Sequence, residues 1–180
     1  MNVRQSSGSD LNGLSLAAIV LAVVAVAVVA RPSTPARKPN VLQQFGPLLA
    51  RYCRLWTAAA RTDNPAKAAP LYAHDPGLVF YGLGQTEYTG WSAYGQGVKS
   101  TLLDNVMSLR FTPAGDLHVT REGNVAWTTS SLRVALTWDN GRSQKFDAQQ
   151  TAVWEHRDGH WLIVHEHLSS PAVLPHAAGN

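Results

Sequence analysis

The sequence predicts an α+β fold in which helices come first and a long antiparallel meander follows. Before residue 104, most apolar residues recur at the spacing of amphipathic helices, whereas after it they alternate as in strands. The sequences DNG at 139–141 and DG at 158–159 are typical of tight turns between strands. Separate runs of helices and strands indicate a domain whose helices cover one face of a sheet.

The first thirty residues predict a signal peptide or an uncleaved signal-anchor helix. Residues 14–30 read LSLAAIVLAVVAVAVVA and carry no charge. This run is short for a membrane span, which needs about 20 residues, and long for the apolar part of a signal peptide. Basic residues after the run favour a cytoplasmic domain, whereas small residues at its end favour cleavage. We favour a membrane-anchored or exported domain on the periplasmic or extracellular side.

The remaining chain divides into a proline-rich basic linker at 31–42, one domain at 43–171 and a disordered tail at 172–180. Residues 1–40 hold four basic residues and one acidic residue, whereas residues 41–180 hold eleven of each. A neutral domain gives no electrostatic support for a nucleic-acid partner. The basic linker is suited to anionic lipid head groups, so we expect a membrane partner through the N-terminal segment.

Helices are predicted in the first half of the domain. Apolar residues from Leu42 onward follow helical spacing until Thr62. Asn64 and Pro65 then supply the N-cap and first position of a short second helix that runs to Tyr72. A buried strand at 78–81, a glycine-rich loop at 82–90 and a helix at 91–103 follow. The single cysteine, Cys53, excludes an internal disulfide and fits a small core residue.

Strands are predicted over residues 108–113, 116–122, 124–138, 144–157 and 160–169. The order of elements, with the motifs LYAHDPGLVFYG, GWSAYGQG, NVAWTT and TAVWEHRDGHWLIVHEHLSSP, resembles the SnoaL-like branch of the nuclear transport factor 2-like superfamily over nearly all of residues 43–171. The resemblance implies a cone, in which a curved antiparallel sheet wraps around helices and leaves a pocket at the open end. It also implies homodimers that pair through the sheet.

The same resemblance leaves the activity open. The superfamily includes ketosteroid isomerases, polyketide cyclases, epoxide hydrolases and dehydratases, as well as binding domains without chemistry, so the fold does not give the function. The isomerases' catalytic aspartate and tyrosine and the hydrolases' Asp-Arg-Asp arrangement have no match here. Gln149 stands where relatives often carry an arginine, which removes a partner for an anionic substrate.

His165 and His167 are the candidate catalytic residues, two positions apart on the last strand. Three interpretations stay open for them. Both imidazoles could be hydrogen-bonded structural groups, or one could be a general acid/base, because histidine titrates near neutral pH. The third is a metal site completed by Asp75 or Glu87.

The pairing of the last hairpin decides what faces these histidines. In a regular strand they share a face with residues 161 and 163. A two-residue turn would place residues 152 and 150 opposite them, whereas a three-residue turn would place Thr151 and Gln149 there. We favour the second register, because it groups four polar side chains and buried polar groups need partners.

Aromatic side chains are the second candidate constellation, since flat apolar walls are typical of small-molecule sites. The ligand-binding candidates, including two polar residues to orient a polar group, are Trp56, Tyr72, Tyr81, Trp91, Tyr94, Trp127, Gln149 and Thr151. No zinc motif, phosphate loop or nucleophile elbow occurs, so no metal or cofactor is expected. We therefore predict a domain that binds a small, largely apolar molecule, dimerises, or does both. The alternative is an isomerase, cyclase, dehydratase or hydrolase that uses a histidine of the pocket.

Overall fold

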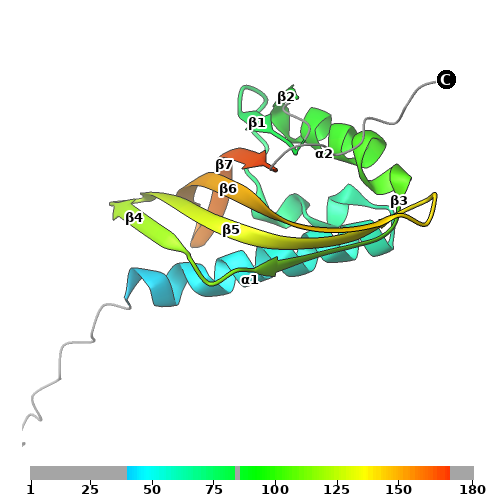
Figure 1. The fold of residues 1–180 in the computed structure, drawn as a ribbon. Coiled ribbons are helices and arrows are strands. Elements are labelled where there is room, and N and C mark those ends of the chain that lie inside the picture. Colours follow the sequence, from blue (N-terminus) through cyan, green and yellow to red (C-terminus); the bar gives the residue numbers. More distant parts are fainter. Residues whose placement is uncertain (1–39, 84–85, 171–180) are drawn as a thin grey trace, which may run out of the picture. The chain divides into compact units, whose positions relative to one another are not determined.

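A computed structural model describes residues 40–83 and 86–170 (Figure 1). The predicted signal peptide or anchor at 1–30, most of the predicted linker and the predicted tail at 172–180 lie outside the described residues. Among the helices that are described, none combines the length and the apolar character needed to cross a membrane.

The first helix, α1 (Val41–Arg61), begins inside the predicted linker because Asn40 caps it. The Asn40 side chain accepts a hydrogen bond from the backbone of Leu42, and the Gln43 side chain accepts one from the backbone of Asn40. This reciprocal arrangement gives hydrogen-bond acceptors to backbone N–H groups that otherwise have no partner at the start of a helix. One face of the helix is buried and contributes Phe45, Leu49, Tyr52, Cys53, Trp56 and Ala59 to the core.

The thiol of Cys53 lies within that buried face and is 3% exposed. Burial raises its pKa to about 12, so the reactive thiolate is scarce at neutral pH. We expect a thiol-specific reagent to modify Cys53 at the rate at which the chain unfolds, measured by mass spectrometry across a urea series. Fast modification of the native protein without urea would contradict this prediction.

The predicted short second helix is instead two separate turns of 3-10 helix, η1 (Pro65–Lys67) and η2 (Ala69–Leu71). Asn64 caps the first turn as predicted, because its side chain accepts from the backbone of Ala66 at 3.0 Å. Pro70 has no N–H to continue a helical ladder, which explains why an α-helix does not form.

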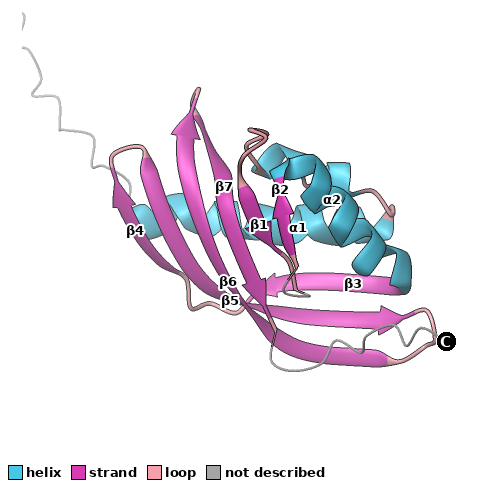
Figure 2. Cartoon of the chain, turned by 90° about the horizontal axis from the view of Figure 1, so that it is seen from above, coloured by secondary structure: helices cyan, strands magenta, loops and turns pink. Residues whose placement is uncertain are grey.

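Strands and a helix follow as β1 (Val79–Tyr81), β2 (Glu87–Thr89), α2 (Gly90–Thr101), η3 (Leu103–Asn105), β3 (Val106–Pro113), β4 (His118–Glu122), β5 (Val125–Trp138), β6 (Ser143–Arg157) and β7 (His160–Ser169). The sheet order is β2-β1-β7-β6-β5-β3, and β4 pairs with the other end of β5 (Figure 2). The α+β prediction is confirmed. The sheet is mixed rather than wholly antiparallel, because β1 and β7 are parallel.

The curved sheet has one covered and one open face. Helix α1 packs against β3 and β4, whereas α2 packs against β1 and β2 (Figure 1). We call the face toward α1 the inner face. On β5 and β6 it carries the buried residues Ala126, Leu132, Val134, Leu136, Trp138, Ala148, Ala152 and Trp154. The residues that alternate with them form the outer face, which is mainly polar.

Candidate functional site

A β-bulge in β7 decides which side chains reach the inner face. The turn at Asp158 and Gly159 has positive φ at both residues, as a two-residue hairpin turn requires. Pairing is regular from that turn to Trp154 opposite Ile163, but the next pair is Val153 opposite residue 165. Residue 164 therefore has no partner on β6, and the alternation of β7 shifts by one position.

The predicted pairing of the histidines is wrong for this reason. His165 and His167 lie on the outer face, opposite to the face of the buried Trp161 and Ile163. Thr151 pairs with His167, one step from the register of the two-residue turn and two steps from that of the three-residue turn. Each of those registers assumed an uninterrupted ladder, and a one-residue slip exchanges the two faces of a strand.

The edge of β7 that faces away from β6 is paired on both sides of the bulge. Before the bulge, the segment around Tyr72 runs parallel to β7 at Ile163, and the Ala73 N–H donates to the Ile163 carbonyl at 3.0 Å. After the bulge, β1 pairs in parallel with Glu166 and His167. Two separate segments thus meet β7 on either side of residue 164.

After the bulge, Glu166 points inward and is fully buried. Its Oε1 atom accepts a hydrogen bond from the Gln150 amide at 2.5 Å. Its Oε2 atom accepts from the hydroxyls of Tyr72 at 2.7 Å and Tyr94 at 2.9 Å. The Trp56 indole donates to the Tyr72 hydroxyl at 2.9 Å. We call these five residues the Glu166 cluster.

The cluster is built to hold a carboxylate in an apolar interior. Burying a carboxylate costs several kcal/mol unless hydrogen bonds replace its water. Gln150, Tyr72 and Tyr94 all act as donors, and an ionised carboxylate is an acceptor at both oxygens. These donors come from β6, the end of η2 and α2, so three distant parts of the sequence converge on one side chain.

Three buried tyrosines stay protonated because of this environment. Burial, followed by the charge of Glu166, raises the pKa of Tyr52, Tyr72 and Tyr94 well above the usual value. A hydroxyl whose pKa is raised remains a donor through the physiological range.

Alkaline pH should therefore destabilise the fold. The folded-state pKa of these three tyrosines is raised, so the stability linked to them is present below the unfolded value of about 10 and falls as pH rises above it. We expect an ultraviolet titration to show three tyrosines that ionise only with unfolding, monitored in parallel by circular dichroism. Ionisation of all five tyrosines in the folded chain would contradict this.

A stack of rings leads from solvent to the cluster. Trp91 is stacked on Tyr72, with ring centres 4.6 Å apart, and His74 lies nearly parallel to the indole of Trp91 on α2 at 5.9 Å. His74 is exposed and Trp91 is half-buried, whereas Tyr72 is buried. Trp91 is thus the ring that stands between the exposed His74 and the cluster.

The predicted site residues divide between the two faces. The structure brings together on the inner side Trp56, Tyr72, Trp91 and Tyr94. It places on the outer face Tyr81, Trp127, Gln149, Thr151, His165 and His167. The predicted grouping of Gln149 and Thr151 with the aromatic wall is wrong, because the neighbouring Gln150 and Ala152 are the inward residues of β6.

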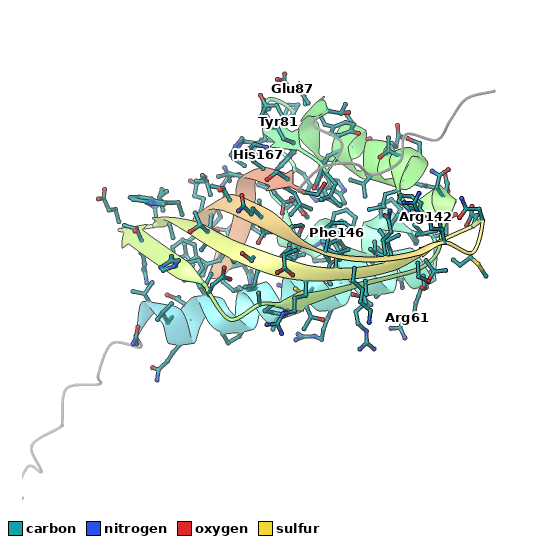
Figure 3. The ribbon with its side chains drawn as sticks, in the orientation of Figure 1. Arg61, Tyr81, Glu87, Arg142, Phe146 and His167 are labelled. Atoms are coloured by element: carbon teal, nitrogen blue, oxygen red, sulfur yellow. The ribbon has the colours of Figure 1, made fainter. Side chains whose placement is uncertain are left out.

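On the outer face, Tyr81 and His167 lie close to each other and to Glu87 (Figure 3). The Tyr81 hydroxyl donates to Glu87 at 2.8 Å, and its ring centre lies 5.5 Å from that of His167. The His165 ring contacts the Val79 carbonyl through Nδ1 at 2.8 Å. The acid/base role of His165 and His167 stays a prediction, and the geometry separates both from the Glu166 cluster.

The third interpretation of the histidines was a metal site, with Asp75 or Glu87 as a possible further ligand. Asp75 forms an ion pair with Arg157, and Glu87 accepts from Tyr81. Across residues 40–83 and 86–170, no three His, Cys, Asp or Glu side chains gather as a metal site would need.

Sequence reasoning missed Gln150 and Glu166. The one available signal was the spacing in β6, where Gln150 alternates in phase with Ala148, Ala152 and Trp154. Glu166 carried no such signal, because its phase depends on the bulge before it.

The fold and the cluster define a cone-like α+β domain with a polar group buried in an aromatic interior. The chain matches the SnoaL-like domain family over residues 50–173, more than half of its length. It therefore belongs to that family. Among curated protein sequences, no relative matches the chain.

Solved structures share the fold at low identity. A nuclear transport factor 2-like superfamily protein from Salmonella enterica is 18% identical, with 76% of this chain and 98% of that chain covered and a TM-score of 0.61. A protein from Xanthomonas campestris, provisionally assigned as a calcium/calmodulin-dependent protein kinase II association domain, is 25% identical, with coverage of 77% and 92% and a TM-score of 0.60. One from Novosphingobium aromaticivorans, provisionally assigned as a scytalone dehydratase, is 13% identical, with coverage of 72% and 87% and a TM-score of 0.57.

Proposed function

We propose that the domain binds a small, planar, largely apolar molecule that carries a hydroxyl group, and that Glu166 is its polar anchor. The observation that supports this is a fully buried carboxylate on which side chains from three separate elements converge. A buried ionisable group among aromatic rings is a common feature of binding and catalytic sites. The SnoaL-like fold supports a domain that binds or converts small molecules.

The chemistry of the cluster defines the ligand class. A carboxylate accepts hydrogen bonds and repels anions, so it favours a neutral ligand with a hydroxyl donor. The surrounding rings of Trp56, Trp91 and Phe80 favour a flat apolar body through stacking and edge contacts. In this proposal the ligand displaces Trp91 from Tyr72, because the indole stands between the exposed His74 and the cluster.

Binding of naphthol tests the proposal against naphthalene, which lacks the hydroxyl, and naphthoate, which is an anion. We expect the affinities measured by quenching of tryptophan fluorescence to be highest for naphthol and lowest for naphthoate. Glu166→Gln should lower the affinity for naphthol about tenfold, since a hydrogen bond to a charged acceptor is lost. It should leave the affinity for naphthalene unchanged. The control is Glu87→Gln, an exposed outer-face carboxylate. Equal naphthol affinity in the native protein and Glu166→Gln would refute the proposal.

A second candidate is catalysis by proton transfer in the same cluster. The supporting observation is that Tyr72 and Tyr94 share one oxygen of Glu166, and that Trp56 donates to Tyr72 in turn. A carboxylate could accept a proton from a bound substrate while a tyrosine hydroxyl donates one. If the domain is an isomerase or dehydratase, Glu166→Gln should keep its affinity for the substrate and lose turnover. If it is a binding protein, the same variant should lose affinity. Affinity and turnover that both survive would exclude this candidate.

We also propose that the domain forms a homodimer through one end of the outer face. Trp127 is 41% exposed, and Trp127, Val153 and His165 are cross-strand neighbours there. Trp127 and Val153 give this row apolar surface, which is typical of contact surfaces. We expect light scattering to give the mass of a dimer for the native chain and of a monomer for Trp127→Arg. A native chain that is monomeric at micromolar concentration would refute this proposal.

The apolar run at 14–30 supports a further proposal, that the segment holds the domain at a membrane or directs its export. Cell fractionation with mass spectrometry of the purified chain distinguishes the two. An intact chain in the membrane fraction supports an anchor, and a chain shortened near residue 30 supports export. An intact chain outside the membrane fraction would overturn both.

A further inference from the structure

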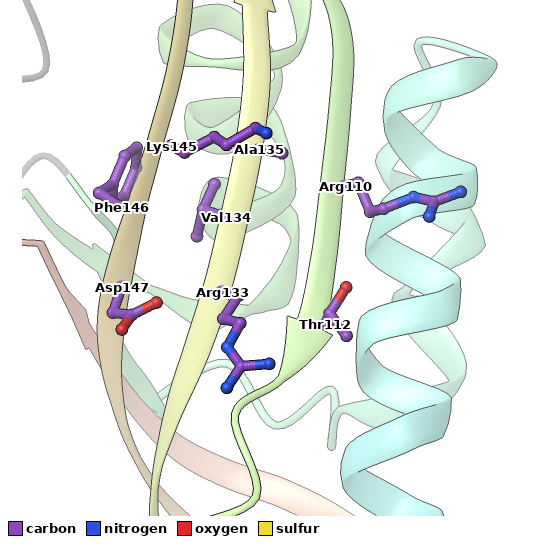
Figure 4. A pocket seen from close by; sticks show the side chains of 8 residues that line it. All are labelled: Arg110, Thr112, Arg133, Val134, Ala135, Lys145, Phe146 and Asp147. Atoms are coloured by element: carbon purple, nitrogen blue, oxygen red, sulfur yellow. The ribbon is translucent and has the colours of Figure 1, made fainter.

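The outer face of β3, β5 and β6 carries a groove of about 380 Å³ beside Arg110, Arg133 and Lys145 (Figure 4). A second groove of about 790 Å³ continues from it toward Arg61 of α1. Arg110, Ala135 and Lys145 line both. The grooves therefore form one continuous surface at the end of β5 opposite to Trp127.

Strand pairing places the basic residues of this groove in neighbouring cross-strand rows. Ala135 lies between Arg110 on β3 and Lys145 on β6 in one cross-strand row, and Arg133 belongs to the next row. The Lys145 side chain extends across β5 beside Ala135 (Figure 4). The small alanine between two long cations leaves room for a ligand above the sheet.

The groove carries more positive than negative charge. Within the described residues, Arg110, Arg133 and Lys145 form no ion pair, whereas Lys99 and Arg157 each contact carboxylates. Among the described residues, Asp147 is the one carboxylate that lines the smaller groove, and it lies opposite Arg133. Residues 41–180 are neutral overall, so the positive charge of the groove is a local excess. The compensating acidic residues lie in other parts of the domain.

Hydroxyl groups continue the polar lining. Ser108, Thr137 and Ser143 form the cross-strand row next to that of Ala135, and the Oγ atoms of Thr137 and Ser143 are 3.0 Å apart. Guanidinium and ammonium groups bind the oxygens of a multiply charged anion, and hydroxyls can donate to its remaining oxygens. Three cations and three hydroxyls offer more hydrogen-bond donors than a ligand with a single carboxylate group could accept.

We propose that this groove binds a phosphate group, carried either by a soluble phosphorylated molecule or by a lipid head group. Arg110 and Lys145 hold the phosphate above Ala135, and Arg133 adds charge from the neighbouring row. The site lies on the face opposite to Glu166 and does not depend on the ligand proposed for the interior. Asp147 weakens the site, because its charge opposes that of the ligand.

Calorimetric titration of the full chain in a non-ionic detergent with inorganic pyrophosphate tests the proposal. We expect Arg110→Gln and Lys145→Gln each to weaken binding about tenfold, since each removes a charge-assisted hydrogen bond. Asp147→Asn should tighten it severalfold. The matched control is Arg54→Gln, which removes an exposed cation of α1 outside the groove and should change nothing. Circular dichroism of each variant establishes that it is folded.

Vesicles identify the source of the phosphate. Phosphatidylcholine vesicles with and without phosphatidylglycerol are mixed with the native chain and the Arg110→Gln/Lys145→Gln variant. A lipid head group is supported if the native chain binds more strongly than the variant to vesicles with phosphatidylglycerol but not to vesicles without it. A soluble phosphate compound is supported if the two chains bind equally to both kinds of vesicle. No saturable binding of pyrophosphate, or an equal loss in Arg54→Gln, would overturn the proposal.

Discussion

Replacing Glu166 with alanine should lower the free energy of unfolding by about 3–5 kcal/mol. The change removes the acceptor for Tyr72, Tyr94 and Gln150, and each buried donor without a partner costs about 1–3 kcal/mol. It also leaves a cavity in a close-packed interior. Urea denaturation followed by circular dichroism measures the loss, and the slope of the transition tests whether unfolding stays two-state.

Two variants separate hydrogen bonding from other causes. Glu166→Gln keeps one acceptor oxygen for the tyrosines but turns an amide donor toward Gln150, so the expected loss is about 1–2 kcal/mol. Glu87→Ala removes an exposed carboxylate and should stay within about 0.5 kcal/mol of the native protein. If Glu166→Ala were as stable as Glu87→Ala, the cluster would not support the fold.

Gly97→Ala should destabilise the domain by about 1–3 kcal/mol, although alanine normally favours a helix by about 1 kcal/mol over glycine. A Cβ atom at position 97 would lie 1.9 Å from a ring carbon of Tyr88. Tyr88 belongs to β2 and packs against α2 at this point, so the ring and the helix would have to separate. Thermal and urea denaturation of the variant measure the cost.

Gly95 is the matched control, because it lies in the same helix. Its nearest neighbour, a ring carbon of Trp91, would be 3.6 Å from a new Cβ, which is an ordinary contact. Gly95→Ala should therefore stabilise the chain by up to about 1 kcal/mol. In a Tyr88→Ala background the penalty of Gly97→Ala should largely disappear. Equal effects of the two glycine changes would show that packing of Tyr88 is unimportant.

Local sequence features were sufficient to predict most elements. The strand predicted at 124–138 is observed as Val125–Trp138, and that predicted at 160–169 has the same bounds. Alternation and turn residues act over a few positions, so they are readable from a single sequence. Of the aromatic residues predicted as one wall, Trp56, Tyr72, Trp91 and Tyr94 lie together in the interior. Tyr81 and Trp127, which were predicted in the same set, lie on the outer face.

The sequence by itself determined the α+β order of elements, the hairpin turns and the aromatic interior. Only the tertiary structure decided which polar residues join that interior. The bulge at residue 164 lies where the segment around Tyr72 and strand β1 meet the edge of β7, and both come from distant positions in the chain. Because side chains alternate along a strand, this single shift turns Glu166 inward and His165 and His167 outward.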